Sequence, residues 1–384
     1  RVHRASDGRV REATADIAES SLLMTSRSIR CQDASATMER SRSVTPPVAG
    51  RSTRASGLPR RGPAWRGCGS CSSGRISLKA MSPSWNPVQI KREEFERADE
   101  PMGTKEKFWV KLPDDDRLWL FKLARERDGV VRGEDWAEWI VHHLAILLGV
   151  PSAAVRPALW KGRRGIVSRS MLRSRSEELV HGNSVLFGHD SGYDQQAKRE
   201  NPNYTPATVR DALRGVLGPD SDAVPAALSG YDVWTGYLVL DAWTAGRDRH
   251  HENWALIRTG GERRLAPSFD HGNALGFAEN DERRTVLLAD GGKLEHWLDK
   301  GKSHYFAGRP SLVELAVQAL MLASPVASEH WIERLKAVAE QDVQAVIDAV
   351  PSEVMSEASR RFAIRLLEAN RRRVLHGYQV VQSG

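Results

Sequence analysis

Apolar and polar positions divide the chain into three stretches with different patterns. Residues 100–170 show the alternation typical of strands, around one stretch with helical spacing. Residues 171–230 are mixed and rich in loops, and residues 231–384 have mainly helical spacing with one hairpin. This order predicts an α+β fold in which a small strand-rich part precedes a larger helical part.

A hairpin is expected early in the strand-rich part, with strands over 105–112 and 117–124. The residues between them read Pro-Asp-Asp-Asp, which favours a tight reversal of the chain. A turn centred on these aspartates places Lys107 opposite Lys122 at the open end of the hairpin. The sequence therefore predicts two lysines side by side at that end.

Lys122 has an unusual place in this hairpin. Side-chain alternation puts it on the same face as Leu118 and Leu120, so a positive charge ends an apolar face. One interpretation is an edge-strand lysine that discourages aggregation. The other is a cation held over a phosphate group.

A helix is expected over 134–148, because apolar side chains recur at helical spacing and Gly149 and Pro151 follow. Glu138 falls nearly opposite the apolar stripe of this helix. Its carboxylate is therefore either solvated or directed toward Lys122.

The passage 245–253, which reads Ala-Gly-Arg-Asp-Arg-His-His-Glu-Asn, is a polar break in the helical part. An apolar helix is expected before it, over 231–243, and a hairpin after it. The hairpin has strands over 254–258 and 263–269 around a Thr-Gly-Gly-Glu turn. The second strand runs directly into Asp270-His271-Gly272.

Three oxygen-bearing side chains are expected to converge at the open end of this second hairpin. Asn253 precedes the outgoing strand, Asp270 follows the returning strand, and a turn near Gly261 makes them neighbours within one residue of register. Asp248 lies five residues before Asn253 on the same loop. Such hard oxygen ligands suit Mg²⁺, although Asp, Asn and Gly also serve turns and helix caps.

Further helices are expected over 311–323, 328–350 and 353–379, with Ser311 and Glu314 in the pattern of a capping box at the start of the first. No run of about 18 apolar residues occurs, which predicts no membrane span.

Charge is concentrated in the first 80 residues. They carry 15 Lys and Arg against 6 Asp and Glu, whereas the whole chain is +7, so residues 81–384 are close to −2. The basic character belongs to this Arg- and Ser-rich segment, and direct nucleic-acid binding by the folded part is not expected. We interpret residues 1–80 as a disordered tail or an upstream extension; a targeting peptide is the alternative.

All three cysteines, Cys31, Cys68 and Cys71, lie in this segment. The folded part has none, which favours a reducing, cytoplasmic location. Cys68 and Cys71 lack a second pair that would complete a structural zinc site.

The motifs at the second hairpin resemble those of a known family. Asp248-Arg249-His250-x-x-Asn253 followed by Phe269-Asp270-His271-Gly272 is similar to the catalytic loop and metal motif of phosphatidylinositol kinases and HipA-like serine/threonine kinases. The stretch 265–270 resembles the HipA-type version, Leu-x-Pro-x-Tyr-Asp. The stretch 103–107 resembles the short phosphate loop, and Phe121-Lys122-Leu123 the strand of the ATP lysine.

This resemblance implies a two-lobed protein-kinase-like α+β fold, with a β-rich N-lobe over 81–183 and a helical C-lobe over 184–384. It implies ATP and Mg²⁺ as cofactors and a Ser/Thr hydroxyl of a protein as acceptor. In this resemblance Asp248 is the catalytic residue, and Asn253 and Asp270 bind the metal ion. The residues implied at the nucleotide are Gly103, Thr104, Lys107, Lys122 and Glu138. Glu138 is expected to pair with Lys122.

Two departures from the HipA pattern bear on activity. Gly246 stands where relatives usually have Asn, and Glu252 stands where they often have a Lys that neutralises the transferring phosphate. The alternatives are therefore a lipid or small-molecule kinase, or a pseudokinase that binds nucleotide without turnover. A toxin role with an antitoxin partner is a further implication of the resemblance alone.

Overall fold

The computed structural model describes residues 83–91, 95–96, 107–127 and 129–384. The expected tail over 1–80 lies outside the described residues, as do Gly103 and Thr104 of the expected phosphate loop. The described strands are β1 Val88–Ile90, β2 Phe95–Glu96, β3 Lys107–Lys111, β4 Leu118–Leu123, β5 Glu126–Arg127, β6 Val130–Val131, β7 Val155–Trp160, β8 Arg163–Arg169, β9 Glu178–His181, β10 Ala255–Thr259 and β11 Glu262–Leu265. The described helices are α1 Glu134–Leu148, α2 Gly182–His189, α3 Pro206–Ala212, α4 Gly230–Thr244, α5 Asp281–Ala289, α6 Gly291–Asp299, α7 Leu312–Leu322, α8 Pro325–Ala337, α9 Glu340–Asp348 and α10 Glu357–Ser383.

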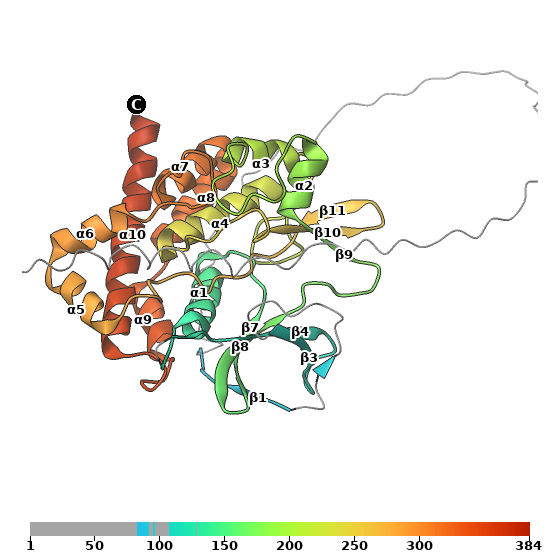
Figure 1. Ribbon diagram of the computed structural model, residues 1–384. Helices are drawn as coiled ribbons and strands as arrows, with labels where there is room; N and C mark the ends of the chain where they lie inside the picture. The colour runs from blue at the N-terminus through green and yellow to red at the C-terminus, as the bar shows by residue number, and fades with distance from the viewer. Residues whose placement is uncertain (1–82, 92–94, 97–106, 128) are drawn as a thin grey trace, which may run out of the picture. The chain divides into compact units, whose positions relative to one another are not determined.

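Among the described residues, one sheet has six strands in the order β1-β7-β8-β4-β3-β2 (Figure 1). β1 runs parallel to β7, and the other neighbours are antiparallel. β3 and β4 form the hairpin that the sequence predicts, and Lys107 pairs with Lys122 as expected. The Pro-Asp-Asp-Asp turn therefore set the register correctly.

Lys122 shares a face of β4 with Leu118 and Leu120 as expected, but this face is the less buried of the two. Trp119 is 4% exposed and Phe121 is fully buried, whereas Leu118 is 36% exposed. The small core of this sheet therefore forms on the face of the two aromatic side chains, where Val110 and Val167 join them. Lys122 points to the opposite face because side chains alternate along a strand. A charge on the less buried face of a sheet needs less compensation than one at the end of a core.

Helix α1 has the predicted bounds and ends at Gly149, whose φ of 83° is left-handed. It lies against β7 and β8 and also against α4, α8 and α9. Arg334 of α8 donates to the carbonyls of Leu147 and Leu148, so it satisfies free acceptors at the helix end. α1 is therefore attached to both the sheet and the helical part.

The helical part is built around α4, in which every residue is buried. α7, α8 and α10 all pack against it (Figure 1). The capping box of Ser311 and Glu314 at the start of α7 is confirmed. The expected single helix over 328–350 is wrong, because the chain is extended at Val338 and Ala339 between α8 and α9.

A side chain replaces one of the backbone hydrogen bonds that are lost at the break between α8 and α9. Arg371 of α10 donates to the carbonyl of Val338 at 2.9 Å, which replaces the helical hydrogen bond that this carbonyl lacks. The change of direction allows α9 to pack against both α1 and α10. Apolar periodicity continues through the break, so the sequence pattern alone does not reveal it.

A smaller sheet has the order β11-β10-β9 among the described residues. β9 lies within the range expected for the N-lobe, yet it pairs antiparallel with β10. β11 ends at Leu265, four residues earlier than predicted, and the following residues approach the site with a single β-bridge, between Ser268 and Ser152. No helix in the described ranges is long and apolar enough to cross a membrane.

Acid destabilisation is expected from His142 on α1. Its Nδ1 lies 2.8 Å from Ser152 Oγ, and burial lowers the pKa of this histidine to about 3. The unfolded chain, with an ordinary histidine pKa near 6.5, takes up a proton first, so stability is full above that pH and falls as pH decreases toward 3. Replacing His142 by Asn should reduce the slope of unfolding free energy between pH 6 and 4 by up to about 1.4 kcal/mol per pH unit.

Urea unfolding at several pH values measures that slope. His376→Asn is a suitable control because His376 is exposed on α10. Equal slopes for the His142 variant and the wild type would contradict the prediction.

Candidate active site

The polar loop begins where α4 ends. Ser229 and Asp232 form a capping box at the start of α4, and Ala245 ends the helix with a left-handed φ of 56°. At Gly246 an added Cβ would lie 3.1 Å from Asp241 Oδ1, tighter than ordinary carbon–oxygen contact. The glycine that departs from the HipA pattern therefore stands directly against a buried carboxylate.

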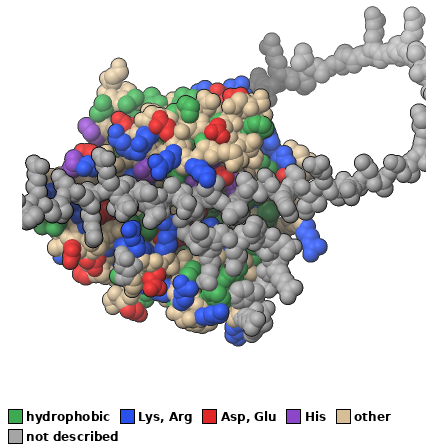
Figure 2. All heavy atoms as spheres, in the orientation of Figure 1, with side chains coloured by type: hydrophobic (Ala, Val, Ile, Leu, Met, Phe, Trp, Pro, Cys, Tyr) green, Lys and Arg blue, Asp and Glu red, His purple; other side chains and the backbone are tan. Residues whose placement is uncertain are grey.

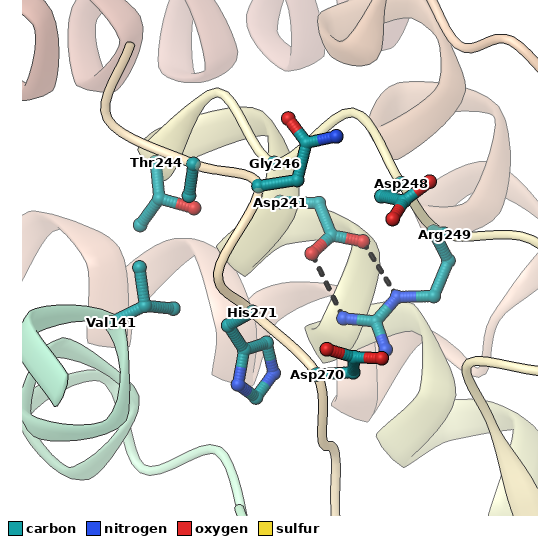
Figure 3. A pocket seen from close by; sticks show the side chains of 10 residues that line it. Val141, Asp241, Thr244, Gly246, Asp248, Arg249, Asp270 and His271 are labelled. Atoms are coloured by element: carbon teal, nitrogen blue, oxygen red, sulfur yellow. Dashed lines mark hydrogen bonds and ion pairs between the residues drawn. The ribbon is translucent and has the colours of Figure 1, made fainter. Parts of the chain in front are cut away.

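A buried ion pair holds the loop in shape. Arg249 donates through Nε and Nη2 to the two carboxylate oxygens of Asp241, at 2.7 and 2.8 Å (Figure 3). Its Nη1 donates to the carbonyl of Asn253 at 2.7 Å. Burial works against the charged form of Arg249, but Asp241 outweighs it and raises the pKa of the guanidinium. Burial also raises the pKa of Asp241, and the Arg249 charge opposes that rise. The guanidinium therefore stays charged, and its contacts tie the loop to α4.

Asn253 folds back onto the same loop. Its Nδ2 donates to the carbonyl of Asp248 at 2.5 Å, and the side chain is buried. The expected register of the hairpin needs correction. Leu256 pairs with Leu265, and the same register extended toward the open end places Ser268, not Asp270, opposite Asn253. The reversal lies between Gly260 and Gly261, within the predicted Thr-Gly-Gly-Glu turn.

Asp248 and Asp270 line one narrow pocket together with Asp241, Arg249 and His271 (Figure 3). Asn253 is not among its lining residues, whereas Asn273, which the sequence did not single out, is. The structure thus brings the two expected aspartates to one recess.

Tyr305 is a site residue that the sequence analysis missed. Its hydroxyl donates to Asp248 Oδ1 at 2.8 Å, and burial together with the Asp248 charge raises the pKa of this phenol. The hydroxyl therefore keeps its proton and remains a donor. The ring lies 5.1 Å from that of His250. No motif marks Tyr305, because it comes from a loop 57 residues further along the chain.

Lys122 approaches the recess from the sheet. Its Nζ lies 2.7 Å from Asp270 Oδ1, with the lysine side chain 20% exposed and the aspartate 42%. Burial disfavours the charged lysine, but the charges of Asp270 and Glu138 outweigh it and raise its pKa. Asp270 has a φ of 61°, in the left-handed region that Asp adopts more readily than most residues. This backbone turns its carboxylate toward the lysine.

Glu138 occupies the position between α1 and the Asp270 loop. Burial raises its pKa, and the charge of Lys122 and the backbone N–H groups of His271 and Gly272 oppose that rise. Lys122 thus forms its ion pair with Asp270, while Glu138 acts on it by charge and accepts from the backbone. The direct Lys122–Glu138 pairing that the resemblance implies is replaced by this arrangement.

His271 beside Glu138 is neutral. Burial holds its pKa well below the ordinary value, and its Nε2 lies 2.7 Å from Ser268 Oγ. Its Nδ1 is 3.9 Å from Glu138 Oε1. These contacts fix the loop that carries Asp270 from both sides.

Lys107 and Glu252, which the sequence analysis also singled out, lie at the edge of the site. Burial lowers the pKa of His250 to about 4, and Lys107 is close enough for its charge to contribute to that decrease. Glu252 turns away toward α2, where its Oε1 accepts from Asn183 Nδ2 at 3.3 Å. Glu252, at the position where HipA relatives often have a phosphate-neutralising Lys, therefore makes a structural contact with α2.

The donor set fits a hard divalent cation. Asp248 and Asp270 supply carboxylate oxygens in one recess, and the Asn253 amide uses its nitrogen toward Asp248, which leaves its oxygen for another partner. The described ranges contain no cluster of three His, Cys, Asp or Glu side chains arranged for a metal. Mg²⁺ typically takes one or two protein carboxylates and completes its shell with water and phosphate, so the set agrees with Mg²⁺ and not with a structural transition-metal site.

Comparison with solved structures identifies the fold. The crystal structure of the proinflammatory kinase CtkA of Helicobacter pylori matches this chain with a TM-score of 0.61 at 14% identity, over 78% of this chain and 98% of that chain. This chain has a protein-kinase-like fold. The two-lobed α+β kinase fold expected from the HipA-like motifs is therefore confirmed. At such identity the likeness concerns the fold alone.

Two further kinase-fold structures match less closely. HipA of Shewanella oneidensis MR-1, solved with HipB and operator DNA, has a TM-score of 0.44 at 11% identity, over 76% of this chain and 66% of that chain. The Golgi casein kinase has a TM-score of 0.33 at 13% identity, over 78% and 73%. No family model and no curated protein matches the sequence.

Proposed function

We propose that this chain is an ATP-dependent phosphotransferase, a HipA-like serine/threonine protein kinase. The observation that carries the proposal is the meeting of Lys122 with Asp270 at 2.7 Å, beside a recess that Asp270 shares with Asp248. A lysine, a metal-binding aspartate and a second aspartate are the parts that phosphoryl transfer requires. They come here from a strand, a loop after a hairpin and a loop after a helix.

Each residue has a distinct task in this proposal. Asp248 accepts the proton of the acceptor hydroxyl as the oxygen–phosphorus bond forms. Asp270 and Asn253 hold Mg²⁺, and Lys122 places its positive charge beside the phosphates. ATP supplies the γ-phosphoryl group and leaves as ADP. Glu138 keeps the Asp270 loop in place through its backbone contacts.

Mass spectrometry of the intact protein tests the proposal. Full-length protein incubated with Mg-ATP, alone and with lysate, should gain phosphate or transfer it to a protein. Thermal stabilisation by Mg-ATP without any phosphate transfer would identify a pseudokinase. The absence of the phosphate-neutralising Lys at Glu252 would then be the relevant departure from the HipA pattern. Labelling of phosphoinositides without labelling of protein would favour a lipid kinase.

The HipA resemblance extends this proposal to a toxin held in check by an antitoxin protein. This extension follows from the family alone. Expression of the wild type should then arrest growth, and expression of an inactive variant should not.

Tyr305 gives a prediction for turnover. Its hydroxyl holds one oxygen of Asp248, so replacing Tyr305 by Phe should remove one hydrogen bond that orients this carboxylate. We expect kcat to fall about tenfold, since hydrogen bonds to charged groups contribute about 1.5–3 kcal/mol. The affinity for Mg-ATP should not change, because the Tyr305 hydroxyl bonds to Asp248 and not to Lys122 or Asp270. Steady-state kinetics with nucleotide titration separates the two effects.

Tyr378→Phe is the matched control for this substitution. Tyr378 lies on α10, and its hydroxyl accepts from Gln382. A fall in nucleotide affinity at Tyr305→Phe equal to the fall in kcat would indicate general disruption of the site and count against a positioning role.

A further inference from the structure

Two segments border Asp248 and the loop that carries it. One is the loop between α6 and α7, which contributes Tyr305 to Asp248 at 2.8 Å and His304 to Arg247 at 2.8 Å. The other is residues 199–201, which are bound to that loop. Asn201 donates its backbone N–H to the Tyr305 carbonyl, and the Gly308 N–H donates to Glu200 Oε1. These contacts form a fixed rim beside the proposed base.

This rim is anchored to the core. Phe306, next to Tyr305, is buried and stacks on Tyr204 with ring centroids 3.9 Å apart. The Ser303 N–H donates to the Pro310 carbonyl, and Lys302 pairs with Ser311 across the base of the loop. The side chains on the rim are therefore presented from a defined backbone.

The rim is rich in positive charge. Arg199 and Arg309 are both exposed, and neither has an ion-pair partner among the described residues. Arg247 lies beneath them in contact with His304. After burial, the charges of Arg247, Arg309 and Arg199 each lower the pKa of His304, which shows that all three lie around one point. In Figure 2 the Lys and Arg side chains that are visible on the face shown are interspersed with Asp and Glu side chains.

Carboxylates lie nearby and offset part of this positive charge. Glu200 accepts from the Gly308 N–H, and Glu279, whose charge acts on Arg247, accepts from Trp297 Nε1 at 3.0 Å. At His304 the arginine charges nevertheless dominate, since Arg247, Arg309 and Arg199 are the charges that shift its pKa. Arg199 and Arg309 are both exposed on the rim that borders Asp248.

The acceptor hydroxyl must come within hydrogen-bond distance of Asp248, which the rim borders through Tyr305. In an in-line transfer the acceptor approaches opposite the leaving group, and the nucleotide side of the recess is marked by Lys122 and Asp270. The Tyr305 hydroxyl already shows that a hydroxyl from the rim side comes within hydrogen-bond distance of Asp248. Residues that flank an acceptor hydroxyl would therefore pass over Arg199 and Arg309.

We propose that this kinase selects Ser or Thr acceptors in acidic segments, with Arg199 and Arg309 as specificity-determining residues that contact Asp or Glu side chains next to the acceptor. The inference rests on the proposed kinase function and names its substrate class. Guanidinium groups suit this task because they bind carboxylates through two parallel hydrogen bonds.

A peptide library tests this inference. Each peptide carries one Ser or Thr, flanked by acidic residues, by their amides or by lysine, and is incubated with the full-length protein and Mg-ATP. Wild-type kcat/KM for acidic peptides should exceed that for amide peptides roughly fivefold or more, the sum of a few exposed ion pairs. The difference should shrink in 0.5 M salt, where the screening length is only about 4 Å.

Charge reversal at the rim gives the decisive comparison. The double variant Arg199→Glu and Arg309→Glu should lose the preference for acidic peptides, measured as the ratio of kcat/KM between acidic and amide peptides. The matched control is Arg361→Glu with Arg372→Glu, two exposed arginines of α10, and it should retain the preference.

The possible results distinguish the inferred substrate class from the proposed kinase function. Equal phosphorylation of acidic and amide peptides by the wild type overturns the inference and leaves the kinase function standing. An unchanged preference in the rim variant also overturns it. Failure to phosphorylate any peptide, protein or lipid overturns the kinase function itself, and the inference with it.

Discussion

Replacing Asp248 by Asn should abolish phosphate transfer while the protein still folds and binds Mg-ATP. The substitution keeps the size of the side chain and its contact with Tyr305 but removes the proton acceptor. Positioned general bases contribute roughly 10²- to 10⁴-fold to rate, so we expect a loss within this range. Incorporation of labelled phosphate measures the rate, and thermal shift with Mg-ATP measures binding.

Asp194→Asn serves as the control for that experiment. Asp194 is an exposed loop aspartate whose carboxylate accepts from the Gln196 N–H, and its replacement should leave the rate unchanged. Retention of full activity by the Asp248 variant would falsify its assignment as the base. Loss of both activity and nucleotide binding would instead indicate a role in metal binding.

Replacing Asp241 by Asn should cause the largest loss of stability in the helical part. The change leaves the Arg249 guanidinium buried and charged with its two carboxylate contacts gone. Removing one partner of such a buried pair costs about 3–5 kcal/mol of unfolding free energy. Chemical denaturation at pH 7 measures the difference, and activity should fall as well because the Asp248 loop loses its attachment to α4.

The pair of Asp211 and Arg214 provides the comparison on the surface. The Arg214 side chain is 82% exposed, so Asp211→Asn should change the unfolding free energy by at most about 1 kcal/mol. Similar losses at Asp211 and Asp241 would show that burial does not strengthen the inner pair and would contradict the expectation.

The elements predicted best are those whose ends are marked by local chemistry. The turn at Pro113 set the register of Lys107 with Lys122, and Gly149 ended α1 as expected. The kinase-like fold followed from motif order. Each of these features depends on residues that are close together in the sequence, where turn and capping preferences act directly.

The features that the sequence did not reveal depend on contacts between distant segments. Tyr305 reaches Asp248 across 57 residues, and Lys122 contacts Asp270 across 148. The break at Val338 is stabilised by Arg371, which lies one helix further along. Periodicity describes which face of an element is apolar, but it carries no information about which distant polar group completes a hydrogen bond.

The attachment of α1 has a mechanical consequence. Glu138 accepts from the His271 and Gly272 backbone, and Arg334 holds the other end of the same helix at Leu148. Because α1 also packs against β7 and β8, it joins the sheet that carries Lys122 to the loop that carries Asp270. A substitution that loosens α1 would therefore alter the distance between the lysine and the aspartate even though it touches neither side chain.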